Sequence, residues 1–229
     1  MAKKGKKYQD VAKLIDPAKL YTLDEAAELL PKLKTAKFDE SIETSIKLNV
    51  DPKQADQNVR GVVGLPAGTG KTVRVAVFTK GDKSTEAKEA GADYVGGEEL
   101  VEKIKEGWLD FDVAVATPDM MATLGKVARI LGPRGLMPNP KAGTVTADVG
   151  KAVREFKGGK IEFRVDKVGT VHCLLGKSSF APEAIKSNFM ALYEAIQKAR
   201  PASVKGTYIG KVYLGLTMSP AIRLDNSKL

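Results

Sequence analysis

The sequence predicts two domains of different fold class: a discontinuous α+β sandwich domain formed by residues 1–67 and 160–229, and a parallel α/β domain inserted over residues 68–159. Three observations lead to this prediction. Both outer segments contain stretches in which apolar and polar residues alternate, which is typical of strands with one buried face. The inserted segment alternates short apolar runs with amphipathic stretches, which is typical of a parallel sheet with helices. Glycine-rich segments mark both crossings between the two patterns.

The first outer segment predicts one helix and two strands. Thr22 and Glu25 form a capping-box pattern, which predicts a helix over residues 22–33. Residues 42–50 carry apolar side chains or threonine at the even positions and polar side chains at the odd positions, so they predict a strand whose even positions are buried. A second strand is expected at about residues 59–65.

The inserted segment predicts a Rossmann-like sheet. Its strands are expected over residues 73–79, 93–95, 113–116 and 144–145. Its helices are expected over residues 84–90, 98–106 and 119–130, with a last one ending near residue 156. The second outer segment predicts antiparallel strands and one helix. The strands cover residues 160–167, 170–175 and 208–218, and the helix covers residues 182–198.

The two crossings contain glycines that can act as hinges or can simply form tight turns. The hinge candidates are Gly68, Gly70, Gly158 and Gly159. The first crossing also resembles a nucleotide-binding P-loop, because Lys71 and a threonine follow Gly70. However, Leu65 stands where the motif requires its first glycine, and a strand is expected where the motif requires a helix.

Residues 132–144 predict a stiff loop that presents cations. This stretch contains three prolines and three glycines, so it can form neither helix nor strand. Arg134 and Lys141 are its only charged residues, and they favour an anionic ligand. The alternative is a long ordered connection that binds nothing.

The charge of the chain predicts a polyanionic partner. The formal net charge is +9 and the pI is about 9.4, and nucleic acid is the commonest partner of such a chain. Residues 160–229 carry 11 cations and 5 anions. In the inserted domain, residues 81–119 have 4 cations against 11 anions, whereas residues 120–159 have 7 against 2. The loop over 132–144 therefore lies in a field that favours phosphate, unless these charges only form a solvated face.

Few residues suit catalysis or metal binding. Cys173 is the only cysteine and His172 the only histidine, and because neighbours in a strand point to opposite faces, both are expected to be structural. We therefore expect no enzymatic activity, no cofactor and no metal. The alternative, a nucleotide-binding α/β enzyme, rests on the fold class alone. No apolar run reaches the ~20 residues of a membrane span, and the basic start leads into a polar stretch, so a cytoplasmic protein without membrane contact is expected.

Four motifs, together with the inserted-domain layout, resemble the family of bacterial large-subunit ribosomal protein L-one. They are Lys-Phe-Asp-Glu-Ser at residues 37–41, Gly-Ala-Asp-Tyr-Val-Gly at 91–96, Gly-Pro-Arg-Gly-Leu-Met-Pro-Asn-Pro at 132–140 and Thr-Met-Ser-Pro at 217–220. The resemblance implies a protein of the mobile stalk beside the ribosomal exit site, a monomer when free, that binds large-subunit ribosomal RNA. It further implies that the protein assists movement and release of deacylated exit-site transfer RNA and represses its own operon by binding the messenger RNA.

The resemblance also implies an RNA surface on the discontinuous domain. The residues that match the family's motifs are Lys37, Phe38, Glu40, Ser41, Thr44, Thr217, Met218 and Ser219. The family commonly has glycine where this chain has Ser219. Hydroxyl and apolar side chains of this kind suit the shallow minor groove of helical RNA, although Phe38 can instead be a core residue and Met218 a gap filler. Lys47, Lys167 and the lysines of the basic start are expected to add phosphate contacts, and Arg134 and Lys141 to touch RNA backbone from the inserted domain.

Overall fold

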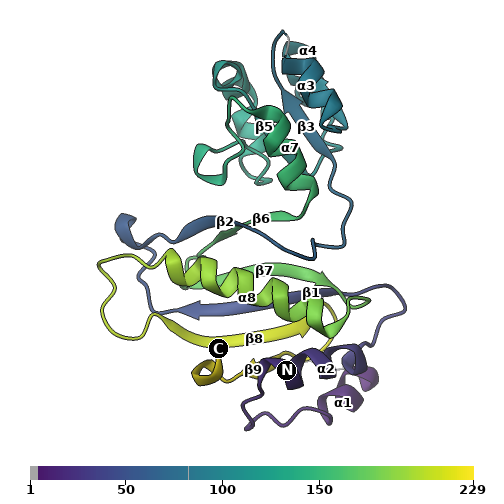
Figure 1. The fold of residues 1–229 in the computed structure, drawn as a ribbon, viewed down its shortest axis with the longest axis vertical. Helices are drawn as coiled ribbons and strands as arrows, with labels where there is room; N and C mark the ends of the chain where they lie inside the picture. Colours follow the sequence, from purple (N-terminus) through teal and green to yellow (C-terminus); the bar gives the residue numbers. More distant parts are fainter. Residues whose placement is uncertain (1–4, 82) are drawn as a thin grey trace. The chain divides into compact units, whose positions relative to one another are not determined.

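The computed structural model describes residues 5–81 and 83–229 (Figure 1). The described chain forms two compact units. The terminal unit comprises the residues up to Gly70 together with Ile161–Leu229, and the inserted unit comprises Lys71–Lys160. The predicted mixture of helices with antiparallel and parallel strands is confirmed. Lys3 and Lys4 of the basic start lie outside the described residues.

The terminal unit is built on a four-stranded antiparallel sheet with the strand order β7-β1-β8-β9. These strands are β1 (Ser41–Leu48), β7 (Thr170–Lys177), β8 (Ile209–Leu216) and β9 (Ile222–Leu224). A two-stranded sheet pairs β2 (Arg60–Gly64) with β6 (Lys160–Arg164). The helices of this unit are α1 (Lys6–Ala12), α2 (Leu23–Leu29) and α8 (Pro182–Lys198). Helix α8 contacts both β7 and β2, so it packs against both sheets.

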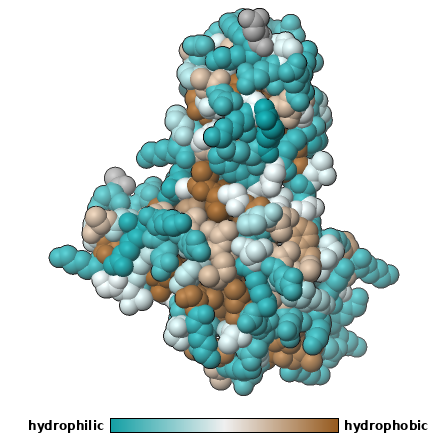
Figure 2. Space-filling view, viewed as in Figure 1, coloured by the Kyte–Doolittle hydropathy of each residue, from teal (hydrophilic) through white to brown (hydrophobic). Residues whose placement is uncertain are grey.

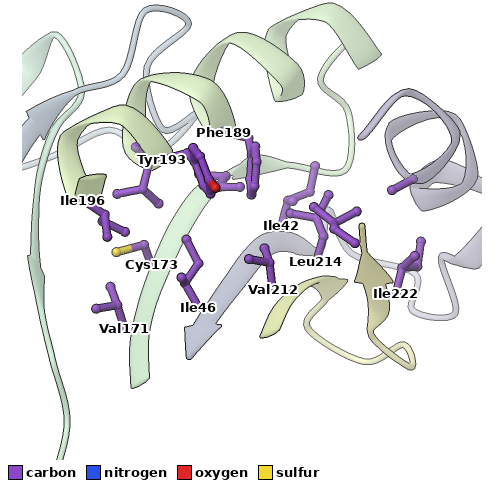
Figure 3. Packing of buried hydrophobic residues seen from close by; sticks show 14 of the residues in the cluster. Ile42, Ile46, Val171, Cys173, Phe189, Tyr193, Ile196, Val212, Leu214 and Ile222 are labelled. Atoms are coloured by element: carbon purple, nitrogen blue, oxygen red, sulfur yellow. The ribbon is translucent and has the colours of Figure 1, made fainter. Parts of the chain in front are cut away.

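One face of the four-stranded sheet forms the core of the terminal unit. Ile42, Ile46 and Leu48 are fully buried, as the alternation in β1 predicts. They belong to one hydrophobic cluster with Phe189 of α8 (Figure 3). Cys173 of β7 also faces this cluster, and burial raises the pKa of its thiol to about 12. The thiol therefore stays protonated at neutral pH and is not a reactive group.

Helix α2 begins at the predicted capping box. The Thr22 hydroxyl accepts a hydrogen bond from Glu25 N (3.2 Å), and the Glu25 carboxylate accepts one from Thr22 N (3.0 Å). The bond from Thr22 N, followed by one from Lys19, holds the pKa of Glu25 below its usual value. The helix continues as a 3-10 turn over Leu30–Leu33, where Pro31 lacks a backbone donor. The predicted helix over residues 22–33 is thus confirmed, with a tighter last turn.

The inserted unit contains a parallel sheet with the strand order β4-β3-β5. Its strands are β3 (Val75–Phe78), β4 (Tyr94–Gly96) and β5 (Val113–Ala116). Its longer helices are α3 (Lys83–Glu89), α4 (Glu98–Lys105) and α7 (Val149–Lys157). Alternate residues of β3 join opposite clusters: Val75 and Val77 pack with residues of α3 and α7, and Ala76 and Phe78 with residues of α4. Helices therefore cover both faces of the sheet, as is usual for parallel strands.

Two predictions for the inserted unit are wrong in detail. The helix expected over residues 119–130 is broken into four short turns. Gly125 lies at the break, where it costs about 1 kcal/mol of helix propensity relative to alanine, and Val127 leaves helical geometry with φ −109°. The turns are η3 (Pro118–Met120), α5 (Met121–Leu124), η4 (Gly125–Val127) and α6 (Ala128–Leu131). The strand expected at residues 144–145 is a single parallel bridge between Ala116 and Val145.

Surface hydrophobicity differs between the two units. On the face drawn in Figure 2, hydrophilic side chains cover most of the inserted unit, whereas the terminal unit also shows groups of hydrophobic side chains. Phe38 and Met218 are among the large hydrophobic side chains of the terminal unit that are exposed. Exposed apolar groups of this kind suit contact with a partner.

Candidate nucleic-acid interface

The residues predicted around positions 37–41 and 217–219 meet where β1 begins and β8 ends. Ile42 lies opposite Leu216 in the antiparallel pair. One residue further out, Ser41 N donates to Thr217 Oγ1 (3.1 Å), and Thr217 N donates to Ser41 O (3.1 Å). Two segments that are 176 residues apart in the sequence therefore form one surface.

The carboxylate of Glu40 holds this surface together from beneath. Glu40 is fully buried. One carboxylate oxygen accepts hydrogen bonds from Thr35 N (2.9 Å) and Ala36 N (2.8 Å), and the other accepts one from Met218 N (3.0 Å). Because a buried carboxylate requires such donors, these bonds fix the loop before β1 against the turn after β8. The prediction that Glu40 contacts RNA is corrected: it positions the surface.

Thr44 is also corrected from a contact to an internal residue. Its side chain is fully buried on the core face of β1. Its hydroxyl donates to Tyr213 O (3.0 Å), so it is satisfied within the protein. Even positions of β1 point into the core, and Thr44 shares that face with Ile42 and Ile46.

Phe38 and Met218 are the apolar groups of the surface. Each is 55% exposed, so Phe38 is not a core residue and Met218 does not fill a gap. Lys37 is exposed beside them. We call this surface the Phe38–Met218 patch. It consists of five exposed or half-buried residues: Lys37, Phe38, Ser41, Thr217 and Met218.

Asp39 anchors the loop that carries Phe38. Its carboxylate accepts hydrogen bonds from Ser178 Oγ (2.7 Å), Ser179 Oγ (2.9 Å) and Ser179 N (3.1 Å). The bonds from Ser178 and Ser179 hold the pKa of Asp39 below its usual value. Two anchored carboxylates, those of Asp39 and Glu40, follow Phe38 in this loop, so its exposed ring is held in place before any binding.

Ser219 uses its hydroxyl within the turn. The hydroxyl accepts a hydrogen bond from Leu216 N (3.1 Å) and lies 3.3 Å from Pro220 O, to which it can donate. No described residue other than glycine has a positive φ, so serine occupies this position without backbone strain. Ser219 thus shapes the turn that presents Thr217 and Met218.

Lys47 and Lys167 lie at the other end of β1. Ser41 and Lys47 are six residues apart, which corresponds to about 20 Å along a strand. Lys47 Nζ donates to the carbonyl of Val168, and Lys167 is exposed in the same turn between β6 and β7. Asp166 fixes this turn by accepting from Val168 N (2.9 Å) and Thr170 N (2.7 Å). These two lysines therefore extend the sheet surface and are not part of the Phe38–Met218 patch.

Arg134 and Lys141 are both exposed on the inserted unit. Their loop is anchored between them. Pro138 is buried, and Asn139 accepts a hydrogen bond from Lys141 N (2.8 Å) through its side chain. Lys141 lies in a 3-10 turn over Pro140–Ala142, so the expectation that the loop contains no helical turn is corrected. Both cations are presented to solvent, and hydrogen bonds between Asn139 and Thr144 close the second half of the loop.

The candidate hinge glycines have mixed geometry. Gly68, Gly70 and Gly159 have positive φ values, whereas Gly158 has φ −72°. At Gly70 an added Cβ would lie 2.8 Å from the ring of Phe180, so this position requires glycine on two grounds. Gly68 O accepts a hydrogen bond from Asn188 Nδ2 (2.8 Å), which ties the first crossing to α8.

The motifs do not identify Lys177 and Tyr8 at the patch, whereas Lys7 belongs to the basic start, whose lysines are expected to contact phosphate. Lys177 Nζ donates to Ser41 Oγ (3.0 Å) from the neighbouring strand β7. Lys7 and Tyr8 of α1 line an open hollow of about 570 Å³ together with Met218. Their sequence signal is only positive charge or an aromatic ring, because strand register and the position of α1 cannot be read from the residues.

The crossing that resembles a P-loop leads into a strand, where the motif requires a helix. Lys71, at the P-loop-like crossing, donates to Asp112 (2.6 Å) and precedes strand β3. Within residues 5–81 and 83–229, no group of three or more histidine, cysteine or acidic side chains is placed to hold a metal ion. Over the same residues, no helix is long and apolar enough to cross a membrane.

The chain matches a known protein family. A family model described as the ribosomal protein L1p/L10e family matches residues 30–220. The matched range includes both halves of the Phe38–Met218 patch and the whole inserted unit. This chain therefore belongs to the ribosomal protein L1p/L10e family, a family of structural proteins that bind ribosomal RNA of the large subunit.

Proposed function

We propose that this protein binds the ribosomal RNA of the mobile stalk beside the exit site, and that it does so through the Phe38–Met218 patch. One observation carries the proposal. Two distant segments are joined into a surface with exposed apolar and hydroxyl groups, and the buried carboxylate of Glu40 bonds to both. From this position the protein assists movement and release of deacylated transfer RNA.

The chemistry of the patch suits the minor groove of an RNA helix. That groove is wide and shallow and displays 2′-hydroxyls and sugar edges. The Thr217 hydroxyl accepts from Ser41 N and lies 3.3 Å from Ser41 O, to which it can donate, and its remaining lone pair can accept from a 2′-hydroxyl. Phe38 and Met218 can pack on sugars or on an unstacked base, and Lys37 can contact phosphate.

We propose that the same patch represses the protein's own operon by binding its messenger RNA. If one surface serves both RNAs, they exclude each other. In a competition titration, a fragment of the operon leader is therefore expected to displace labelled stalk RNA completely, to the level reached by unlabelled stalk RNA. A ternary complex of protein with both RNAs would contradict a shared surface.

We further propose a division of roles, in which residues 1–67 and 160–229 give specificity and the inserted domain over 68–159 adds backbone contacts. The double substitution Arg134→Gln and Lys141→Gln is expected to reduce the slope of log K against log salt by up to about 2, because each lost phosphate contact reduces it by about 1. The preference for stalk RNA over an unrelated duplex should remain. Salt-dependent titrations measure both quantities.

The matched control for this variant removes two lysines from the acidic half of the inserted domain. Lys103 and Lys105 are exposed in the last turn of α4. Lys103→Gln with Lys105→Gln makes the same charge change and should leave the slope unchanged. Equal effects of the two double variants would show that only net charge matters, and a loss of preference in the Arg134 and Lys141 variant would place specificity on the inserted domain.

A further inference from the structure

A row of four polar side chains crosses the four-stranded sheet. Ser45 of β1 lies opposite His172 of β7 on one side and opposite Tyr213 of β8 on the other. Tyr213 in turn lies opposite Arg223 of β9. Directly opposed residues point to the same face of a sheet. His172, Ser45, Tyr213 and Arg223 therefore form one line across all four strands, which we call the transverse row.

The transverse row lies on the face of the sheet that points away from the core. Ser45 is an odd position of β1, and its neighbours Thr44 and Ile46 point into the core. The side chain of His172 is 61% exposed, and Arg223 is exposed. Ser45 and Tyr213 are half-buried, as is expected in the middle of a sheet. The row is thus open to a partner along its length.

Two side chains of the row have partners within the protein, and the other two keep their hydrogen-bonding groups for a ligand. Ser45 Oγ lies 3.0 Å from His172 Nδ1, and His172 Nε2 lies 3.7 Å from Asp166. Over the described part of the chain, the side chains of Tyr213 and Arg223 make no hydrogen bond or ion pair. The phenol and the guanidinium therefore remain available for a ligand.

The surroundings of the row are cationic. An open hollow of about 640 Å³ beside it is lined by Ser45, Tyr213, Lys47 and Lys211, among others. Lys211 is exposed and, within residues 5–81 and 83–229, makes no ion pair. The acidic side chain on the same face of β1 is that of Glu43. An extended surface with this charge suits a polyanion.

The row is continuous with the Phe38–Met218 patch. Ser41 and Ser45 are on the same face of β1, because they are four residues apart. Thr217, in the turn after β8, is hydrogen-bonded to Ser41. Four residues correspond to about 13 Å along a strand. An RNA that contacts the patch therefore needs to extend only about this distance across the open face to reach the row.

We infer that the transverse row is a second RNA contact, in which Arg223 neutralises a phosphate and Tyr213 bonds a ribose or phosphate oxygen of the stalk ribosomal RNA. This inference rests on the proposed function and assigns it residues outside the Phe38–Met218 patch. Helical RNA is recognised largely through such 2′-hydroxyl and phosphate contacts, which no single sequence motif encodes.

The test uses the full-length chain and titrates stalk ribosomal RNA at several salt concentrations. Arg223→Gln is expected to reduce the salt slope by about 1 and to weaken binding about eightfold at 0.1 M salt, the contribution of one phosphate contact. Tyr213→Phe removes only the hydroxyl and is expected to weaken binding about two- to tenfold with no change in slope. The matched control is Lys198→Gln, because Lys198 ends helix α8 on the opposite face of the sheet.

The outcomes separate this inference from the proposed function. If the wild type prefers stalk RNA over an unrelated duplex and Arg223→Gln matches Lys198→Gln, the row makes no RNA contact and the inference is overturned. If the wild type shows no preference, the proposed function is contradicted, and the inference, which assigns the row to stalk RNA, is overturned with it. A reduced slope for Arg223→Gln, with Lys198→Gln unchanged, supports the row as a contact.

Discussion

Replacing Glu40 with alanine is expected to lower the free energy of unfolding of the terminal unit by about 3 kcal/mol, because buried donors left without acceptors cost about 1–3 kcal/mol each. The substitution removes the acceptor from Thr35 N, Ala36 N and Met218 N at once. Hydrogen exchange should accelerate at these three amides, and chemical denaturation should give the change in stability. Specific RNA binding should be weakened with them, because the loop before β1 is no longer fixed against the turn after β8, although the bonds between Ser41 and Thr217 remain.

Glu43 provides the control for this substitution. It lies three residues further along the chain, in β1, and is exposed. Glu43→Ala is expected to change the stability by no more than about 0.5 kcal/mol, as is usual for a surface position. If Glu40→Ala were as mild as Glu43→Ala, the buried carboxylate would not be what holds the surface together.

Replacing Thr217 with valine is expected to weaken binding to stalk RNA about tenfold or more, because it removes a hydroxyl from the centre of the patch and leaves Ser41 N without its acceptor. Valine keeps the shape of threonine, so the fold should remain intact. No charge is lost, so the salt slope should stay the same. Titration at several salt concentrations separates these two quantities.

Thr207 offers the same chemical change at the opposite end of β8. It is exposed and precedes the strand, well away from the patch. Thr207→Val is expected to leave RNA binding unchanged. If both substitutions weakened binding to stalk RNA equally, or if Thr217→Val changed the salt slope, Thr217 would not be a residue of specific recognition.

Local signals in the sequence predict much of the fold. The capping box of α2 and the alternation of β1 each depend on residues that are close together in the sequence, and both are confirmed. The segment over residues 119–130 has helical periodicity, but Gly125 and the geometry of Val127 divide it. Helix α1 buries no residue, and strand β9 is only three residues long. Neither element therefore gives a strong periodic signal in the sequence.

The candidate site is less predictable, because its residues act through long-range contacts. The motifs identify Phe38, Thr217 and Met218, which the structure shows to be exposed. They do not distinguish these exposed residues from the buried Glu40, whose role depends on donors in two other segments. The alternation of β1 already placed Thr44 on the buried face, and that signal was the correct one.

His172 shows a further limit. As a neighbour of Cys173 in a strand it was expected to be structural, and the opposite orientation of the two side chains is confirmed. Its exposed position opposite Ser45 depends on the pairing of β1 with β7. Strand register of this kind is set by contacts across 127 residues of sequence and is not visible in either strand alone.

The most direct test of the central claim is a titration of the wild-type protein with stalk ribosomal RNA and with an unrelated RNA duplex of equal length, over a series of salt concentrations. Recognition by the Phe38–Met218 patch predicts that stalk RNA binds about tenfold or more tightly at every salt concentration, while both affinities fall with salt. Equal affinity for the two RNAs throughout the series would contradict specific recognition and would leave only a basic protein that binds phosphate.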